Sequence, residues 1–355
     1  MSKRTRYHNS KAISYAVVAA LLYGISAPAS KVLVVEIPPT MMAALLYLGA
    51  GIGMFIVNLI RAMSKKERIE ARMTKRELPF VIGMIALDIV APIFLMIGLT
   101  LTTSSNVSLL NNFEIVATAI IALFIFKESI GRRMWIAILL ITLSSMMLSI
   151  SDIRNLSLSV GSIFVLLASV SWGFENNCTR MLSLKDPLQI VVVKGFGSGI
   201  GALIITVFAR ELRFNFLYIS LTLLLGFVAY GLSIYLYIRA QRELGAARTS
   251  AYYAAAPFIG VFVSWILLKE PLTPTFSMAL VVMLVGTYFA VTENHGHKHL
   301  HVQTTHEHKH NHHDGHHNHV HENEVAGEHS HEHSHEQQEH EHAHLPDMHH
   351  RHEHP

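Results

Sequence analysis

The sequence predicts an all-α integral membrane protein of ten transmembrane helices, arranged as two inverted five-helix repeats and followed by a disordered tail. Three observations predict this fold class: long apolar runs, an internal repeat and the placement of Lys and Arg. Of the 355 residues, 51% are hydrophobic and 15% are charged, and the mean hydropathy is +0.37, which is too apolar for a soluble surface. The runs are about 18 to 25 residues long, enough to cross about 30 Å of hydrocarbon as helices. The predicted spans are 12–35, 41–60, 79–99, 102–126, 132–150, 157–178, 187–208, 215–238, 245–268 and 273–292.

Short motifs of the first five spans return in the second five at offsets of about 142 to 149 residues. The matched motifs are Gly49–Gly53 with Gly197–Gly201, Tyr23-Gly24 and Lys31 with Trp172-Gly173 and Arg180, and Lys127-Glu128 with Lys269-Glu270. Because five is an odd number, the second copy enters the membrane from the opposite side, which makes the repeat inverted. The repeat also favours a retained first helix over a cleaved signal peptide. The predicted domains are a cytoplasmic N-terminus (1–11), a first repeat (12–150), a second repeat (151–292) and a tail (293–355).

Lys and Arg gather in loops that share one side of the membrane. If the N-terminus is inside, the basic loop 61–78 and the segments around Arg132 and Arg239 are cytoplasmic, whereas the opposite loops hold few basic residues. Basic loops mark the cytoplasmic side. We therefore expect both termini to be cytoplasmic, in a cell inner membrane or plasma membrane. The basic excess is a signal of topology, and no nucleic-acid partner is expected.

Few charged side chains fall inside the predicted spans, and four of them are candidate site residues: Asp88, Glu114, Glu175 and Lys194. A charge at the membrane centre costs about 2.5–3.5 kcal/mol on insertion scales, so it usually marks a cavity, a pathway or an ion pair. Glu114 or Glu175 could bind a cation or exchange protons with a water-accessible cavity. Alternatively, Glu175 could be a structural partner of Lys194 or Arg180. Lys194 could anchor an anionic substrate, although snorkelling from a helix end is the favoured interpretation.

Polar side chains beside these charges share one face of each helix. They are Asn111, Asn112 and Glu114 in span four, and Trp172, Glu175 and Asn176 in span six. The functional hypothesis is that the two faces converge on one substrate cavity. The structural alternative is that the amides only bond across helices, which contributes about 0.6 kcal/mol each.

Tyrosines and glycines offer weaker signals. Tyr230 in span eight, and Tyr252 and Tyr253 in span nine, could line the cavity. The alternative for Tyr252 and Tyr253 is that they anchor their helix at the membrane interface. The glycines of spans two and seven are predicted to allow helices to pack closely.

The tail carries 24 of the 25 histidines, mixed with acidic residues and almost no apolar ones, which predicts disorder. Neutral imidazole binds Zn, Ni, Co and Cu, so the tail is predicted to bind such ions. The candidate metal ligands are His295, His297, His299, His301, His306, His308, His310, His312, His313, His316, His317 and His319. Delivery, sensing and buffering of metal remain alternative roles.

Together the motifs resemble the drug/metabolite transporter superfamily, specifically its EamA-type ten-helix members. The resemblance rests on the aromatic-Gly steps followed by a basic residue, the Lys-Glu pairs and the Gly-rich spans quoted above, and it covers roughly residues 12–292. It implies a secondary carrier, commonly an exporter of amino acids, other metabolites, drugs or nucleotide-linked compounds, with its cavity between the repeats. The polar segment Trp172–Arg180 and the histidine tail depart from the general pattern.

The leading hypothesis is therefore an exporter of a small polar metabolite or drug by alternating access, which could be proton-coupled. The alternative is a divalent-metal exporter that uses the tail as acceptor or sensor. An enzyme is not expected, because no span contains histidine and Asp88 is the only aspartate in a span, so a nucleophile with its base is missing. The expected partners are the lipid bilayer and a small-molecule substrate, with divalent metals as further candidates. No cofactor is required, and the sequence leaves a monomer and a homodimer open.

Overall fold

The computed structural model describes residues 3–63, 74–126, 130–152, 157–182, 185–244, 249 and 252–292, together with four short strands of the tail. The helices of the first half are α1 (Lys3–Gly24), α2 (Ser26–Leu33), α3 (Pro39–Met63), η1 (Lys75–Glu77), α4 (Leu78–Leu101), α5 (Ser104–Leu110), α6 (Phe113–Phe126) and α7 (Arg132–Ser149). Those of the second half are α8 (Val160–Arg180), α9 (Pro187–Phe208), α10 (Phe216–Leu225), the π-helical η2 (Gly226–Leu232), α11 (Ser233–Leu244), α13 (Ala256–Leu267) and α14 (Pro274–Val291). A short antiparallel pair, β1 (Ile150–Asp152) with β2 (Ser157–Leu158), lies at the junction of the halves.

The helices form one bundle that matches the predicted membrane fold. Within the described residues, eight helices are long and apolar enough to cross a membrane, and α13 is a shorter apolar helix. A further described helix, α8, corresponds to the predicted span 157–178. Its 21 residues include the polar segment around Glu175. The predicted span 245–268 is described as a helix from Ala256 onward.

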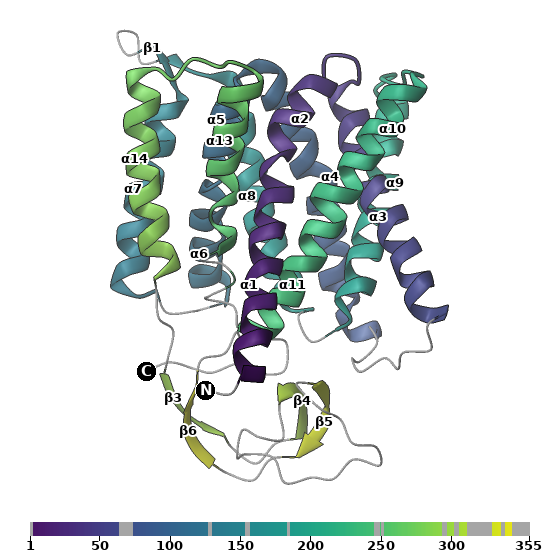
Figure 1. Cartoon of the computed structure of the whole chain (residues 1–355), viewed down its shortest axis with the longest axis vertical. Coiled ribbons are helices and arrows are strands. Elements are labelled where there is room, and N and C mark those ends of the chain that lie inside the picture. The colour runs from purple at the N-terminus through teal and green to yellow at the C-terminus, as the bar shows by residue number, and fades with distance from the viewer. Residues whose placement is uncertain are drawn as a thin grey trace.

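Each half packs against the other in a symmetric pattern. The spans that correspond in the two repeats contact one another: α3 packs against α9, α5 against α13, and α7 against α14. The contact between α4 and α8 has its counterpart in the contact between α11 and α1, because α4 and α11 are corresponding spans of the two repeats, as are α8 and α1. Figure 1 shows α7 and α14 together at one edge of the bundle and α3 and α9 at the other. This pattern is what an approximate two-fold axis between inverted repeats produces.

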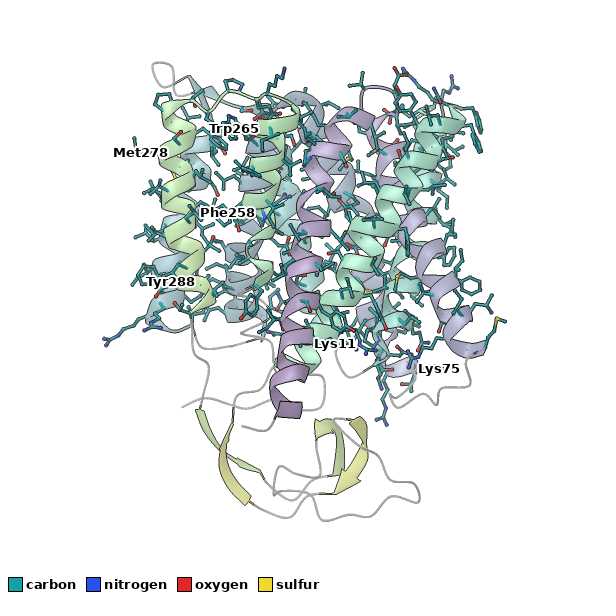
Figure 2. The ribbon with its side chains drawn as sticks, viewed as in Figure 1. Lys11, Lys75, Phe258, Trp265, Met278 and Tyr288 are labelled. Carbon is teal, nitrogen blue, oxygen red and sulfur yellow. The ribbon has the colours of Figure 1, made fainter. Side chains whose placement is uncertain are left out.

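Large apolar side chains cover the flank of the bundle. Met278, Trp265 and Tyr288 are 59%, 49% and 65% exposed and project from α14 and α13 (Figure 2). Lys11 and Lys75 lie toward one end. A soluble protein would not expose so much apolar surface, so the flank is the surface that contacts lipid.

Glycines let the helices of the two halves cross closely, as predicted for spans two and seven. A Cβ on Gly51 of α3 would lie 2.9 Å from the backbone N of Phe196, and one on Gly195 of α9 would overlap the backbone of Gly51. The aromatic-Gly steps have the same role: a Cβ on Gly173 would lie 2.9 Å from the backbone N of Thr118 on α6, and one on Gly24 would lie 2.7 Å from the carbonyl O of Ala256. Close crossing therefore explains why these motifs occur in both repeats.

Two predicted spans are broken near their middle. Span one turns at Ile25 between α1 and α2, where Pro28 has no N–H to donate to the carbonyl of Gly24. Span four turns at Asn111 and Asn112 between α5 and α6. These breaks differ from the continuous helices that hydropathy predicts, because hydropathy does not report where backbone bonds are interrupted.

The tail differs in part from the predicted disorder. Its described residues form two antiparallel pairs, β3 (His297–His301) with β6 (Gln338–His342) and β4 (Thr305–His310) with β5 (His329–Ser334). They lie beyond the end of the bundle at which α1 begins (Figure 1). Alternation of His with other residues has the period of a strand, which a composition argument for disorder does not consider.

Candidate functional site

Three buried charged residues meet between α4, α8 and α9. Lys194 Nζ lies 3.0 Å from Asp88 Oδ2 and 2.9 Å from Glu175 Oε1. The three side chains are 11%, 0% and 3% exposed. Asp88 belongs to the first repeat and the other two residues to the second, so this charge triad joins the halves. Two carboxylates against one ammonium give it a net charge of −1 when all three are ionised.

Neighbouring hydroxyl groups complete the charge triad. Tyr47 of α3 donates a hydrogen bond of 2.7 Å from its hydroxyl to Asp88 Oδ1, and Thr179 donates one to Glu175 Oε1. Tyr47 lies on α3, which packs against both α4, the helix of Asp88, and α9, the helix of Lys194. A buried charge is tolerated only when it is paired and hydrogen-bonded, and each member of the triad meets that condition.

Glu114 of α6 contacts α8 at Asn176, the residue next to Glu175 of the charge triad. Asn176 donates a 2.6 Å hydrogen bond from Nδ2 to Glu114 Oε1 and a 3.2 Å bond to Thr118 Oγ1. Glu114 occupies the first turn of α6, where the helix dipole stabilises a negative charge. Among the described residues Glu114 has no basic partner within ion-pair distance. It is therefore a partly exposed carboxylate inside a membrane span that has no counter-charge.

Five tyrosines form a cluster beside both features. The ring centroids of Tyr23 and Tyr230 are 6.1 Å apart, those of Tyr23 and Tyr253 are 5.7 Å apart, and those of Tyr237 and Tyr253 are 4.8 Å apart. Tyr47 lies 5.5 Å from Tyr230 and connects the cluster to Asp88. These rings come from α1, α3, the π-helical segment, α11 and the residues before α13, so they hold several spans of both repeats around one centre.

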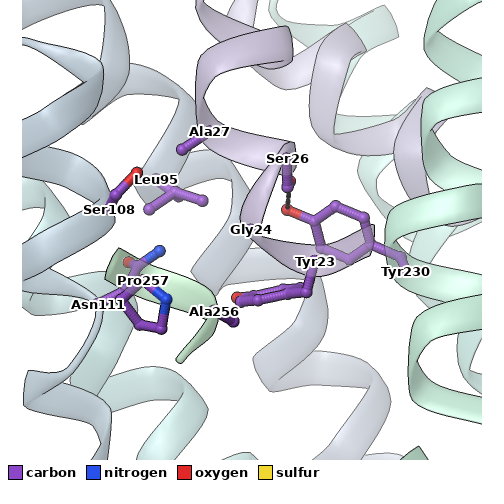
Figure 3. Close-up of a pocket in the computed structure, with 10 residues that line it drawn as sticks. All are labelled: Tyr23, Gly24, Ser26, Ala27, Leu95, Ser108, Asn111, Tyr230, Ala256 and Pro257. Carbon is purple, nitrogen blue, oxygen red and sulfur yellow. Dashed lines mark hydrogen bonds between the residues drawn. The ribbon is translucent and has the colours of Figure 1, made fainter. Parts of the chain in front are cut away.

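A small cavity opens beside the tyrosine cluster at the two helix breaks (Figure 3). It offers about 10 Å³ to the centre of a water-sized sphere, which is room for about one water molecule. Ser26 donates a 3.3 Å hydrogen bond to the Tyr230 hydroxyl at its edge. Ser108 Oγ and Asn111 Oδ1 line the same cavity, are buried and have no hydrogen-bond partner within the described structure. Broken helices around a central cavity are typical of transporter binding sites.

Polar contacts also join the two halves at both ends of the bundle. At one end Lys185 Nζ lies 3.5 Å from Glu77 Oε1. At the other end Glu270 accepts hydrogen bonds of 2.8 Å from the backbone N–H groups of Ser104 and Ser105 at the start of α5. The central cavity thus lies between two sets of contacts across the repeats.

The structure assigns several predicted site residues to definite places. Asp88, Glu175 and Lys194 meet in the charge triad, so the alternative in which Glu175 pairs with Lys194 is the arrangement observed. The favoured interpretation of Lys194 as a snorkelling residue is wrong. It lies mid-helix in α9 and its ammonium binds two carboxylates, which replace the water that snorkelling would provide.

Other predicted residues divide between the interior and the surface. Asn111 and Tyr230 line the cavity, and Asn176 binds Glu114. Asn112 is 2% exposed and donates to the carbonyl of Leu109, and Trp172 is 5% exposed in the core. Tyr252 is 37% exposed; its neighbour Tyr253 joins the tyrosine cluster instead.

Sequence reasoning missed Tyr47 and Thr118 as site residues. Their signal is weak, because a single Tyr or Thr in an apolar span costs little and is common at many positions. Tyr23 and Tyr253 stand in the sequence as parts of an aromatic-Gly step and a Tyr pair. Nothing in their spacing places them against one another, since their spans are far apart in the chain.

No metal site is visible in the part of the chain that the structure describes: it holds no group of three or more His, Cys, Asp or Glu side chains that could bind an ion. Of the predicted ligands, six histidines from His297 to His310 lie on β3 and β4. The other six and all of the imidazole positions are outside the described structure. Metal binding by the tail stays a prediction.

Comparison with known proteins gives the same architecture. The EamA-like transporter family matches residues 10–150 and again residues 159–292. A solved crystal structure that is 14% identical superposes with a TM-score of 0.58 over 79% of this chain and 95% of that chain, which shows a shared fold.

Two curated relatives are named as transporters. An uncharacterized transporter of Methanothermobacter thermautotrophicus is 26% identical over 293 residues, which cover 77% of this chain and 83% of that protein. Uncharacterized transporter YyaM of Bacillus subtilis is 22% identical over 179 residues, or 48% of this chain and 58% of that protein. These names agree with the expectation that the chain is not an enzyme. Because the family matches both halves of a multi-pass helical bundle, the chain belongs to the EamA-like transporter family, within the drug/metabolite transporter superfamily.

Proposed function

We propose that this protein is a secondary transporter that exports a small polar metabolite or drug by alternating access of its two repeats. The observation that carries the proposal is the charge triad of Asp88, Glu175 and Lys194, which is buried inside the helix bundle and joins the first repeat to the second. Charged residues inside membrane spans usually line a transport pathway or form an ion pair. A pair that spans the two moving halves is suited to both roles.

Proton coupling is part of the proposal. The charge triad carries one more negative charge than positive, and Glu114 adds a further carboxylate without a counter-charge. Either site could take up a proton from one side and release it to the other as the halves rock. Tyr47 donates a hydrogen bond to Asp88 and Thr179 donates one to Glu175, whereas Asn176 donates to Glu114. Proton entry would then drive solute export.

We further propose that the protein lies in a cell inner or plasma membrane with both termini in the cytoplasm. Lys11 and Lys75 lie at the end of the bundle beyond which the tail strands are found (Figures 1 and 2). Basic residues at this end favour the cytoplasmic side. Reporter fusions at residues 61–78 and 293–355 test this, and reporters on opposite faces of the membrane would contradict it.

The experiment that tests transport uses the full chain in liposomes that enclose a pH-sensitive dye. Small amines, amino acids, sugars and organic acids are added in turn, and movement of solute and protons is followed. We expect at least one solute to move with protons, and Glu175→Gln and Glu114→Gln each to abolish the movement. Glu36→Gln is the control, because Glu36 is an exposed carboxylate in the loop before α3. Full transport by both site variants would refute the assignment of the site.

A further inference from the structure

The charged and polar side chains at the centre of the bundle favour a solute of one charge class. We propose that the solute carries an ammonium group with N–H donors, and that Glu114, Ser108 and Asn111 bind this group beside Tyr23. This inference rests on the proposed transport function and names the substrate class for the same site.

The charge balance favours a cation. The centre of the bundle holds three carboxylates, those of Asp88, Glu175 and Glu114, and one ammonium group, that of Lys194. Lys194 already contacts two of them, so it offers no free positive charge to an anionic solute. A carboxylate inside a membrane requires a counter-charge or a proton, and among the described residues Glu114 has no basic group within ion-pair distance. A solute cation would supply what Glu114 lacks.

The unpaired atoms of the cavity require a donor. Ser108 is 3% exposed, and its Oγ and the Asn111 Oδ1 are buried without hydrogen bonds. A buried acceptor without a donor costs about 1–3 kcal/mol, which a ligand that brings N–H groups would recover. Glu114 does not line this cavity, but it follows the lining residue Asn111 by three positions, and its backbone N–H donates to the Asn111 carbonyl at 3.1 Å.

The size and the walls of the cavity fit an ammonium head. Its volume accommodates about one water-sized group, and an ammonium group is of that size. Tyr23 lines it, and the ring centroid of Tyr23 lies 5.7 Å from that of Tyr253. Aromatic faces attract cations. The remainder of the solute occupies space that opens as the two halves separate.

Thermal unfolding of the full chain in detergent tests the inference with three matched probes. Phenethylammonium, 2-phenylethanol and phenylacetate share one skeleton and differ in charge. Methylammonium and putrescine extend the cationic set. A ligand that binds only the folded protein raises the melting temperature with concentration. We expect the amines to raise it in a saturable way, and the neutral and anionic probes to leave it unchanged.

Variants separate binding at the cavity from general charge effects. Glu114→Gln is expected to weaken the apparent affinity for the amines by about tenfold or more, because a hydrogen bond to a charged group contributes about 1.5–3 kcal/mol. Glu114→Asp keeps the charge and is expected to retain part of the affinity, and Glu36→Gln to retain all of it.

Two outcomes would overturn the inference. One is no shift with any amine, which means that the cavity holds water only. The other is an amine shift that persists in Glu114→Gln. If the liposomes move a neutral or anionic solute while no amine binds, transport stands and the cation site fails. If no solute of any charge moves, the proposed function itself fails.

Discussion

The charge triad and Glu114 involve adjacent residues of α8, Glu175 and Asn176, and they differ in how their charges are satisfied. Glu175 of α8 pairs with Lys194, which also binds Asp88, so every charge in the triad has an opposite charge within 3.0 Å. Asn176, the next residue of α8, gives Glu114 a neutral hydrogen bond at 2.6 Å. One region is therefore complete within the protein, whereas the other still requires a cation or a proton. The difference supports our proposal that Glu114 receives the solute, and the triad joins the two repeats through its ion pairs.

Removal of a charge should distinguish the two regions most strongly. Lys194→Met leaves two buried carboxylates without a counter-charge and is expected to lower the free energy of unfolding by about 3–5 kcal/mol. Glu114→Gln is expected to leave stability nearly unchanged while it abolishes transport. Denaturation of both variants in detergent checks the contrast. Lys194→Met combined with Asp88→Asn and Glu175→Gln should recover much of the loss. Equal stability of the Lys194 and Glu114 single variants would remove the distinction.

The tyrosines offer a smaller test of the same contrast. Tyr47→Phe removes the donor to Asp88, and a hydrogen bond to a charged group contributes about 1.5–3 kcal/mol. Tyr23→Phe is the matched control for stability, because the Tyr23 hydroxyl makes no hydrogen bond within the described residues. We expect Tyr47→Phe to unfold at lower temperature and Tyr23→Phe to unfold near the parent. The reverse order would show that the triad does not depend on Tyr47.

Two glycines of α9 test the close crossing beside the charge triad. An added Cβ at Gly195 meets the backbone of Gly51, whereas one at Gly197 meets the end of the Ile85 side chain, which can move. Gly195→Ala is expected to destabilise the protein by about 1–3 kcal/mol through overpacking, and Gly197→Ala by less. Thermal melts and transport rates of the two variants check this. Similar melts would mean that the α3–α9 crossing adjusts freely.

The fold could be predicted from the sequence, because every span must be apolar and long enough to cross the hydrocarbon core of the membrane. Apolar length, an odd number of helices per repeat and basic loops gave the architecture. The breaks at Ile25 and Asn111 could not be predicted in this way, since they depend on individual backbone hydrogen bonds. Pro28 was a usable signal for the first break.

The candidate site could be predicted only as a set of costly charges. The free-energy cost of placing a charge inside the membrane identified four candidates: Asp88, Glu114, Glu175 and Lys194. Which of them pair is decided by helix contacts between distant spans, and the sequence left this open. The sequence likewise did not distinguish Tyr252 from Tyr253, because neighbouring residues on a helix face directions about 100° apart.

The tail should have the smallest effect on transport, since the charge triad, Glu114 and the cavity all lie within residues 12–292. Deletion of residues 295–355 is expected to leave the melting temperature and the basal transport rate of the bundle unchanged. Added Zn, Ni, Co or Cu should bind the full chain more strongly than the shortened one, if the histidines act as ligands. Titration calorimetry and liposome transport on the two forms measure these effects separately. Loss of transport on deletion, with the melt preserved, would mean that the tail acts on the carrier cycle itself, and the contrast between the triad and Glu114 would no longer account for solute movement alone.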